Sequence, residues 1–146
     1  MLKHIKQSKR FSCGAASIAS ILDIPEKEAI LGCKTTHNGT NTGNVCSFLE
    51  SKSIKYQRIY IGLPYECVFG HLRLLSNEYP IYVSANFICN SGRGRNSQRH
   101  HAIAIDKSQI FDPGESKVND MDCIGHLYNR DLIIKEIVLV NFEEKN

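Results

Sequence analysis

A cysteine stands where a polar loop turns into a helix-forming run, in the stretch QSKRFSCGAASIASIL of residues 7–22. Apolar residues recur at helical spacing over 13–22, which predicts a helix that begins at Cys13 with Ser12 as its N-cap. Backbone N–H groups and the helix dipole stabilise negative charge at that position, so a thiol there loses its proton readily. Cys13 is therefore the candidate nucleophile.

The stretch RHHAIAIDKSQIFDPG holds a candidate base and its orienting group. A two-residue turn at 107–108 would place His101 diagonally across a hairpin from Asp112, on the same face and within reach of a hydrogen bond. His100 has the opposite parity and is expected on the other face. Because a thiolate nucleophile needs a base and the base needs an orienting acceptor, these residues predict a set of Cys13, His101 and Asp112.

Acyl transfer through a thiolate also needs hydrogen-bond donors for the oxyanion that develops on the substrate. The main-chain N–H of Cys13 is one candidate donor. The side-chain amide of Gln7, a few residues upstream, is the candidate for the second, and an ordinary surface glutamine is the alternative reading.

The segment SGRGRNSQRHH, which begins at residue 91, reads as part of a polar, glycine-rich loop next to His101. Arg93, Arg95 and Arg99 are candidate substrate-binding residues, because a guanidinium group presents paired donors to a carboxylate or phosphate. The alternative is a solvated loop. Aromatic residues are not interleaved with the arginines, so the pattern does not favour nucleic acid as a partner.

Composition indicates one globular domain over residues 1–146. With 42% hydrophobic residues and a net charge of +3, the chain can form a core and carries only a mild basic excess. No apolar run has the length of a signal peptide or a membrane span, so we expect a cytoplasmic protein. The six cysteines form no CxxC pair, which predicts free thiols, five of them packing residues, and neither metal nor other cofactor.

Periodicity predicts helices first and antiparallel strands later. The expected helices cover 13–22, 25–32, 42–52 and 65–77, and the expected strands cover 54–61, 80–87, 101–106, 109–114 and 132–142. Residues 121–131 read as a loop or short helix. This segregation indicates an α+β fold in which a helical lobe, with the nucleophile at a helix N-terminus, packs against an antiparallel sheet.

The chain resembles the papain-like cysteine peptidases, and most closely the bacteriocin-processing peptidase domains that cut after a double-glycine leader. Gln7, five residues and then CGAA match the opening of that family, and HAIAI followed by IFDP matches its second block. The resemblance spans roughly residues 5–140. It implies a papain-like fold and a cysteine peptidase with Cys13 as nucleophile, His101 as base and acid, Asp112 as orienting group and Gln7 as oxyanion donor. The partner it implies is a peptide or protein substrate.

Two other readings use the same residues. A glutamine deamidase or transglutaminase would form its thioester from a glutamine side chain through the same triad. A catalytically idle binding module of this fold is the third reading, although such modules usually lose the cysteine or the histidine, and this chain has both. Oligomeric state and substrate sequence are not indicated by the residues.

Overall fold

The computed structural model describes residues 2–91, 95–115, 117–121 and 132–143, and it describes only the backbone of 87–91 and 95–99. In this part of the chain there are four helices and six strands. The helices are α1 (Cys13–Leu22), α2 (Glu26–Gly32), α3 (Thr42–Ser51) and α4 (Tyr65–Ser76). The strands are β1 (Tyr56–Pro64), β2 (Ile81–Ser91), β3 (Arg95–Asp106), β4 (Gln109–Phe111), β5 (Asn119–Asp120) and β6 (Leu132–Val140).

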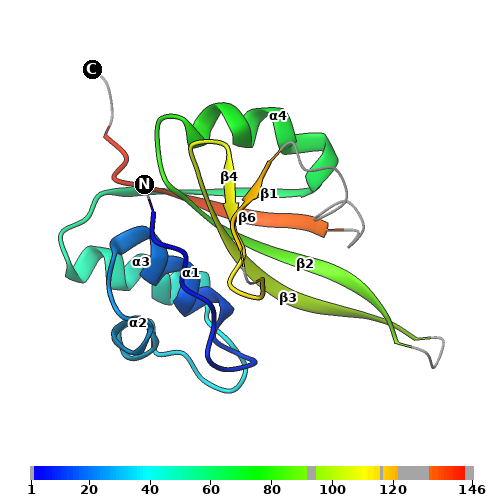
Figure 1. Ribbon diagram of the computed structural model, residues 1–146, viewed down its shortest axis with the longest axis horizontal. Helices are drawn as coiled ribbons and strands as arrows, with labels where there is room; N and C mark the ends of the chain where they lie inside the picture. Colours follow the sequence, from blue (N-terminus) through cyan, green and yellow to red (C-terminus); the bar gives the residue numbers. More distant parts are fainter. Residues whose placement is uncertain (1, 92–94, 116, 122–131, 144–146) are drawn as a thin grey trace.

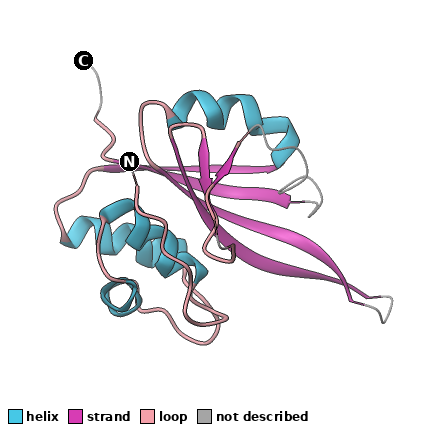
Figure 2. Cartoon of the chain, viewed as in Figure 1, coloured by secondary structure: helices cyan, strands magenta, loops and turns pink. Residues whose placement is uncertain are grey.

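All paired strands run antiparallel in one sheet of order β1-β6-β2-β3-β4-β5. Helices α1, α2 and α3 lie together on one side of this sheet, and α4 lies on the other (Figure 1). Figure 2 shows the same arrangement by type of element, with the long β2–β3 hairpin extending beyond the helices. The predicted α+β class is confirmed, and the sheet is covered on both faces rather than one.

Two apolar clusters account for this layering, one on each face of the sheet. Buried residues of α1–α3 pack with Tyr82, Ala102 and Val138 of the sheet. On the opposite face, α4 packs with a second set that includes Val83 and Ile103. Because neighbouring residues of a strand point to opposite faces, each central strand contributes to both clusters.

The helix boundaries follow local capping chemistry. The Asn41 side chain accepts a hydrogen bond from the Gly43 N–H at 2.6 Å and caps α3, which begins at Thr42. Pro25 is the N-cap of α2, whose helical residues begin at Glu26. The N-termini of both helices therefore lie within one residue of their predicted positions.

The predicted turn between β3 and β4 is confirmed together with its register. Lys107 and Ser108 both have positive φ, of 50° and 62°, as a two-residue hairpin turn with the twist of its strands requires. Asp106 pairs with Gln109 in this register, although the strand pairing ends at Phe111 rather than continuing to 114. This register sets the relation between His101 and Asp112.

The loop expected after the second predicted strand is mostly strand instead. β2 continues to Ser91, which pairs with Arg95 at the start of β3. Strand pairing uses main-chain N–H and C=O groups, so a polar, glycine-containing sequence can extend a hairpin that a buried segment has already registered. Of the expected loop or helix at 121–131, only Met121 lies inside the described residues.

Candidate active site

Cys13 is the first residue of α1, as predicted, and its side chain is largely buried. Ser12 occupies the N-cap position, but its hydroxyl does not cap the helix. Instead, Ser12 Oγ accepts from the Lys9 N–H at 3.1 Å and lies 3.2 Å from Glu26 Oε2, so it closes the preceding turn and ties that turn to α2. Ser12 is therefore the N-cap residue, as predicted, without a side-chain capping bond, and the sulfur has its expected position.

Gly14 permits the close packing behind the nucleophile. A Cβ atom at this position would lie 2.6 Å from Thr40 Cβ and 2.8 Å from the Tyr82 hydroxyl, closer than packed atoms approach. The small residue after Cys13 therefore lets the start of α1 approach both the 36–40 turn and strand β2.

His101 and Asp112 form the expected pair. His101 Nε2 donates to Asp112 Oδ1 at 2.9 Å, and Asp112 is fully buried. The same carboxylate oxygen accepts from the Gly114 N–H at 2.9 Å, and His4 Nε2 donates to the Asp112 carbonyl at 2.8 Å. Asp112 is thus held by its own turn and by the N-terminal segment.

The Cys13 sulfur and the His101 ring line the same pocket, and each shifts the pKa of the other. Burial opposes ionisation of the thiol, but hydrogen bonds from His100 and His101 and the positive charge of His101 lower the pKa of Cys13 from 9.0 to about 6. Burial also opposes protonation of His101, yet its bonds to Asp112 and Cys13 raise the pKa of the imidazole to about 9. These opposite shifts favour a thiolate–imidazolium pair between the two side chains.

His100 was not anticipated at the sulfur. Its strand parity differs from that of His101, yet both rings line the pocket into which the Cys13 sulfur opens. The parity of His100 is that of the β3 face against which α1 packs, because Ala102 and Ala104 share the core cluster of Cys13. The signal that could have found it is this alternation combined with the placement of α1, which the sequence does not show.

Gln7 lies in the same pocket as Cys13, but its amide is engaged elsewhere. Its Nε2 donates to the carbonyls of Lys9 at 2.8 Å and Arg10 at 3.3 Å. Its main-chain N–H donates to the Pro113 carbonyl at 2.9 Å, which fixes the segment beside the Asp112 turn. The amide can serve an oxyanion only if it gives up one of these carbonyls.

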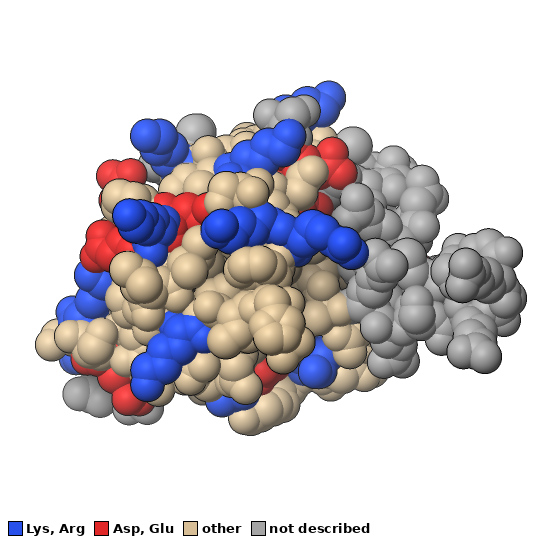
Figure 3. Space-filling model, turned by 90° about the horizontal axis from the view of Figure 1, so that it is seen from below, with Lys and Arg blue, Asp and Glu red and all other residues tan. Residues whose placement is uncertain are grey.

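The three arginines proposed to bind substrate receive no structural account. Arg93 lies outside the described residues, and Arg95 and Arg99 are described by their backbone alone, as part of strand β3. On the face shown in Figure 3, which is seen from below the view of Figure 1, Lys and Arg side chains are scattered, with acidic side chains among them. A role for the three arginines stays a prediction.

The other thiols differ from Cys13. The structure describes Cys33, Cys46 and Cys67 as free, along with Cys13. Burial raises the pKa of Cys33 to about 12 and also raises that of Cys46, as expected of packing residues. Cys67 is exposed on α4, so its prediction as a packing residue is wrong. The side chain of Cys89 and all of Cys123 lie outside what is described.

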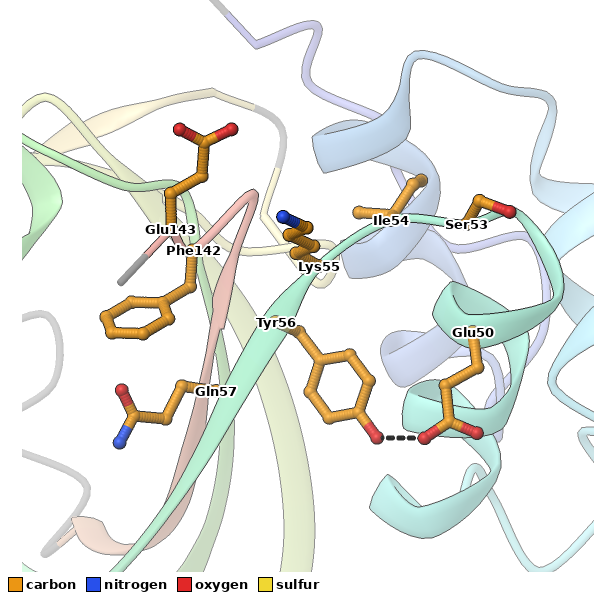
Figure 4. Close-up of a pocket in the computed structure, with 8 residues that line it drawn as sticks. All are labelled: Glu50, Ser53, Ile54, Lys55, Tyr56, Gln57, Phe142 and Glu143. Carbon is orange, nitrogen blue, oxygen red and sulfur yellow. Dashed lines mark hydrogen bonds between the residues drawn. The ribbon is translucent and has the colours of Figure 1, made fainter. Parts of the chain in front are cut away.

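The sulfur opens into a pocket of about 550 Å³, lined by Gln7, Arg10, Phe11, Cys13, His37, Asn38, Gly39, His100 and His101. A larger hollow of about 870 Å³ lies between the end of α3, the start of β1 and residues 142–143, where the Tyr56 hydroxyl bonds to Glu50 (Figure 4). Neither cysteine nor histidine lines that hollow, so we place the candidate chemistry in the smaller pocket. Within the described ranges, no group of three or more potential ligands is arranged to hold a metal.

Two solved structures share this architecture. One is a double-glycine motif protease from an AMS/PCAT transporter in complex with the leader peptide, with a TM-score of 0.65 and 16% identity over 96% of this chain and 91% of that one. The other is the peptidase domain of Streptococcus ComA, a bifunctional ABC transporter involved in a quorum-sensing pathway, with a TM-score of 0.62 and 15% identity over 96% and 98%. The chain has the papain-like fold of these peptidase domains.

The papain-like fold predicted from the motifs is therefore confirmed. No protein-family model and no curated protein matches the sequence. No helix in the described part of the chain has both the length and the apolarity to cross a membrane. The cytoplasmic location stays a prediction.

Proposed function

We propose that residues 1–146 act as one papain-like cysteine peptidase domain that hydrolyses a peptide or isopeptide bond. The observation that carries this proposal is the His101–Asp112 hydrogen bond beside a thiol whose pKa is lowered to about 6. Such an arrangement supplies a thiolate and a proton donor together at neutral pH. The fold shared with two peptidase domains, one of them in complex with a leader peptide, supports a peptide substrate.

In the proposed reaction the Cys13 thiolate attacks the substrate carbonyl carbon, and the C=O electron pair moves onto oxygen. The main-chain N–H of Cys13 donates to this oxyanion, and Gln7 joins it if its amide leaves the Arg10 carbonyl, the longer of its two bonds. As the intermediate collapses, the C–N bond breaks and His101 gives its proton to the leaving amine. The product is a thioester on Cys13.

Water then completes the proposed cycle. His101, now neutral, takes a proton from a water molecule that attacks the thioester carbonyl. The C–S bond breaks, the carboxylic acid product leaves, and the thiolate–imidazolium pair forms again. Asp112 keeps the imidazole oriented through Nε2 in every step, which leaves Nδ1 to face the sulfur and the substrate.

Peptide digestion with matched variants tests the proposal. A proteome-derived peptide mixture is incubated with the wild-type chain, Cys13→Ala and Cys67→Ala, and mass spectrometry identifies new peptide ends. We expect new ends with the wild type and with Cys67→Ala, and a loss of roughly 10³-fold or more with Cys13→Ala. Turnover that survives in Cys13→Ala contradicts the proposal. Amide-to-acid conversion without new ends indicates a deamidase instead.

A further inference from the structure

The environment of His100 resembles that of His101 in one respect. Each imidazole is held through Nε2 by a buried side chain: His101 by Asp112, and His100 by Ser84, whose Oγ lies 2.9 Å from Nε2. Ser84 is on β2, the strand paired with β3, so the sheet itself positions the partner. His100 nevertheless remains exposed, because it borders the pocket into which the Cys13 sulfur opens.

The rings of His100 and His101 line the pocket into which the Cys13 sulfur opens, and both lower the pKa of that thiol. With Nε2 of His100 next to the Ser84 hydroxyl, the ring nitrogen left for the sulfur is Nδ1. A Ser84 hydroxyl that donates to Nε2 fixes the neutral tautomer whose proton is on Nδ1. That tautomer presents an N–H group to the sulfur.

We propose that His100 is a second histidine of the catalytic centre, which donates from Nδ1 to the Cys13 thiolate while Ser84 orients its ring. His101 supplies the charge and the mobile proton, and His100 supplies a fixed dipole. The inference rests on the proposed function, because it assigns a role around the nucleophile of that reaction. It explains why an exposed histidine beside the nucleophile is tied to a buried serine.

Several titratable and charged groups surround His100. His101 supplies positive charge beside the sulfur. Arg10 and His37 line the same pocket, and the buried Tyr82 hydroxyl lies near the start of α1, while Asp112 is committed to His101. On the side of Ser84, the Glu136 carboxylate lines a pocket with His100, together with Arg58 and Lys135. That carboxylate is bonded to Arg58 at 2.7 Å.

The test is the pH profile of Cys13 alkylation by iodoacetamide, followed by peptide mass spectrometry with Cys67 as the internal reference thiol. Wild type is compared with His100→Ala, His100→Asn and His100→Gln. We expect His100→Ala to move the midpoint upward by about one pH unit, because a hydrogen bond to a charged group is lost. His100→Asn should restore most of the shift, since its amide nitrogen falls near the place of Nδ1, whereas His100→Gln resembles Nε2 and should not.

Each outcome bears on one of the two proposals. A midpoint in His100→Ala equal to the wild type, alongside a raised midpoint in His101→Ala, overturns the role of His100 and leaves the proposed function standing. Equal behaviour of the Asn and Gln variants overturns the assignment to Nδ1. A wild-type Cys13 with the midpoint of Cys67 overturns both. Ser84→Ala should move the midpoint in the same direction as His100→Ala, and by less.

Discussion

At the scale of single residues, different side chains around the Cys13 sulfur supply charge and hold the ring of His101 in place. In the proposed reaction His101 carries the proton, and the fully buried Asp112 bonds that ring and raises its pKa. The relation between these two residues could be predicted from the sequence, because a two-residue turn fixes hairpin register. The position of His100 in the pocket of Cys13 could not, since it depends on which face of β3 receives α1.

We expect turnover to be confined to a window between about pH 6 and about pH 9. Below the pKa of Cys13 the sulfur is a thiol and attacks poorly, and above the pKa of His101 the ring has no proton for the leaving amine. In Asp112→Asn the acceptor oxygen remains but its charge is lost, so the alkaline limit should fall by about one pH unit.

The measurement is kcat/KM against pH for a peptide identified by digestion, with wild type and Asp112→Asn side by side. Asp112→Ala is the control that removes the acceptor as well, and its rate should fall by roughly 10²-fold or more. An alkaline limit that is the same in wild type and Asp112→Asn would show that the carboxylate does not set the protonation of His101.

At the scale of elements, the start of α1 packs closely against its neighbours, and the small residues after Cys13 only suggest this packing. The helix and its first residue follow from periodicity, but the reason for Gly14 is visible only in its neighbours, Thr40 and Tyr82. The length of the β2–β3 hairpin could not be predicted from an apolar pattern. Beyond Phe87 the two strands are joined by main-chain pairing between mostly polar residues.

Two glycine-to-alanine substitutions in helices should act in opposite directions. Gly14→Ala places a methyl group against Thr40 and Tyr82 and should destabilise the fold by about 1–3 kcal/mol. Gly70→Ala, within α4, meets no atom within 4 Å and should stabilise it by about 0.5–1 kcal/mol through helix propensity. Urea unfolding midpoints measure both, and a stabilised Gly14→Ala variant would contradict the packing described here.

At the scale of the whole molecule, the candidate site lies at the seam between the helical layer and the sheet. Cys13 comes from the first layer, His100 and His101 come from the second, and the N-terminal segment crosses to the Asp112 turn. The sequence indicates both layers and the meeting of the three segments. The sequence does not indicate the order of the strands or the face on which α4 packs. Both depend on contacts between residues far apart in the chain.

The pKa of Cys13 is lowered while those of Cys33 and Cys46 are raised, so unfolding should change their labelling rates in opposite directions. Unfolding returns each thiol toward 9.0, so the buried Cys33 and Cys46 should label faster once the chain opens, as is usual. Cys13 should label more slowly. At pH 7 its thiolate fraction falls roughly 90-fold, while the more basic thiolate regains roughly 20-fold in nucleophilicity, leaving a several-fold loss.

Pulse labelling with a disulfide reagent across a urea series, read by mass spectrometry, would record both trends in one sample. Parallel increases at Cys13 and Cys33 would mean that the native chain does not activate the first sulfur. If the labelling rate of Cys33 rises while that of Cys13 falls, one chain reports its unfolding through two independent thiols.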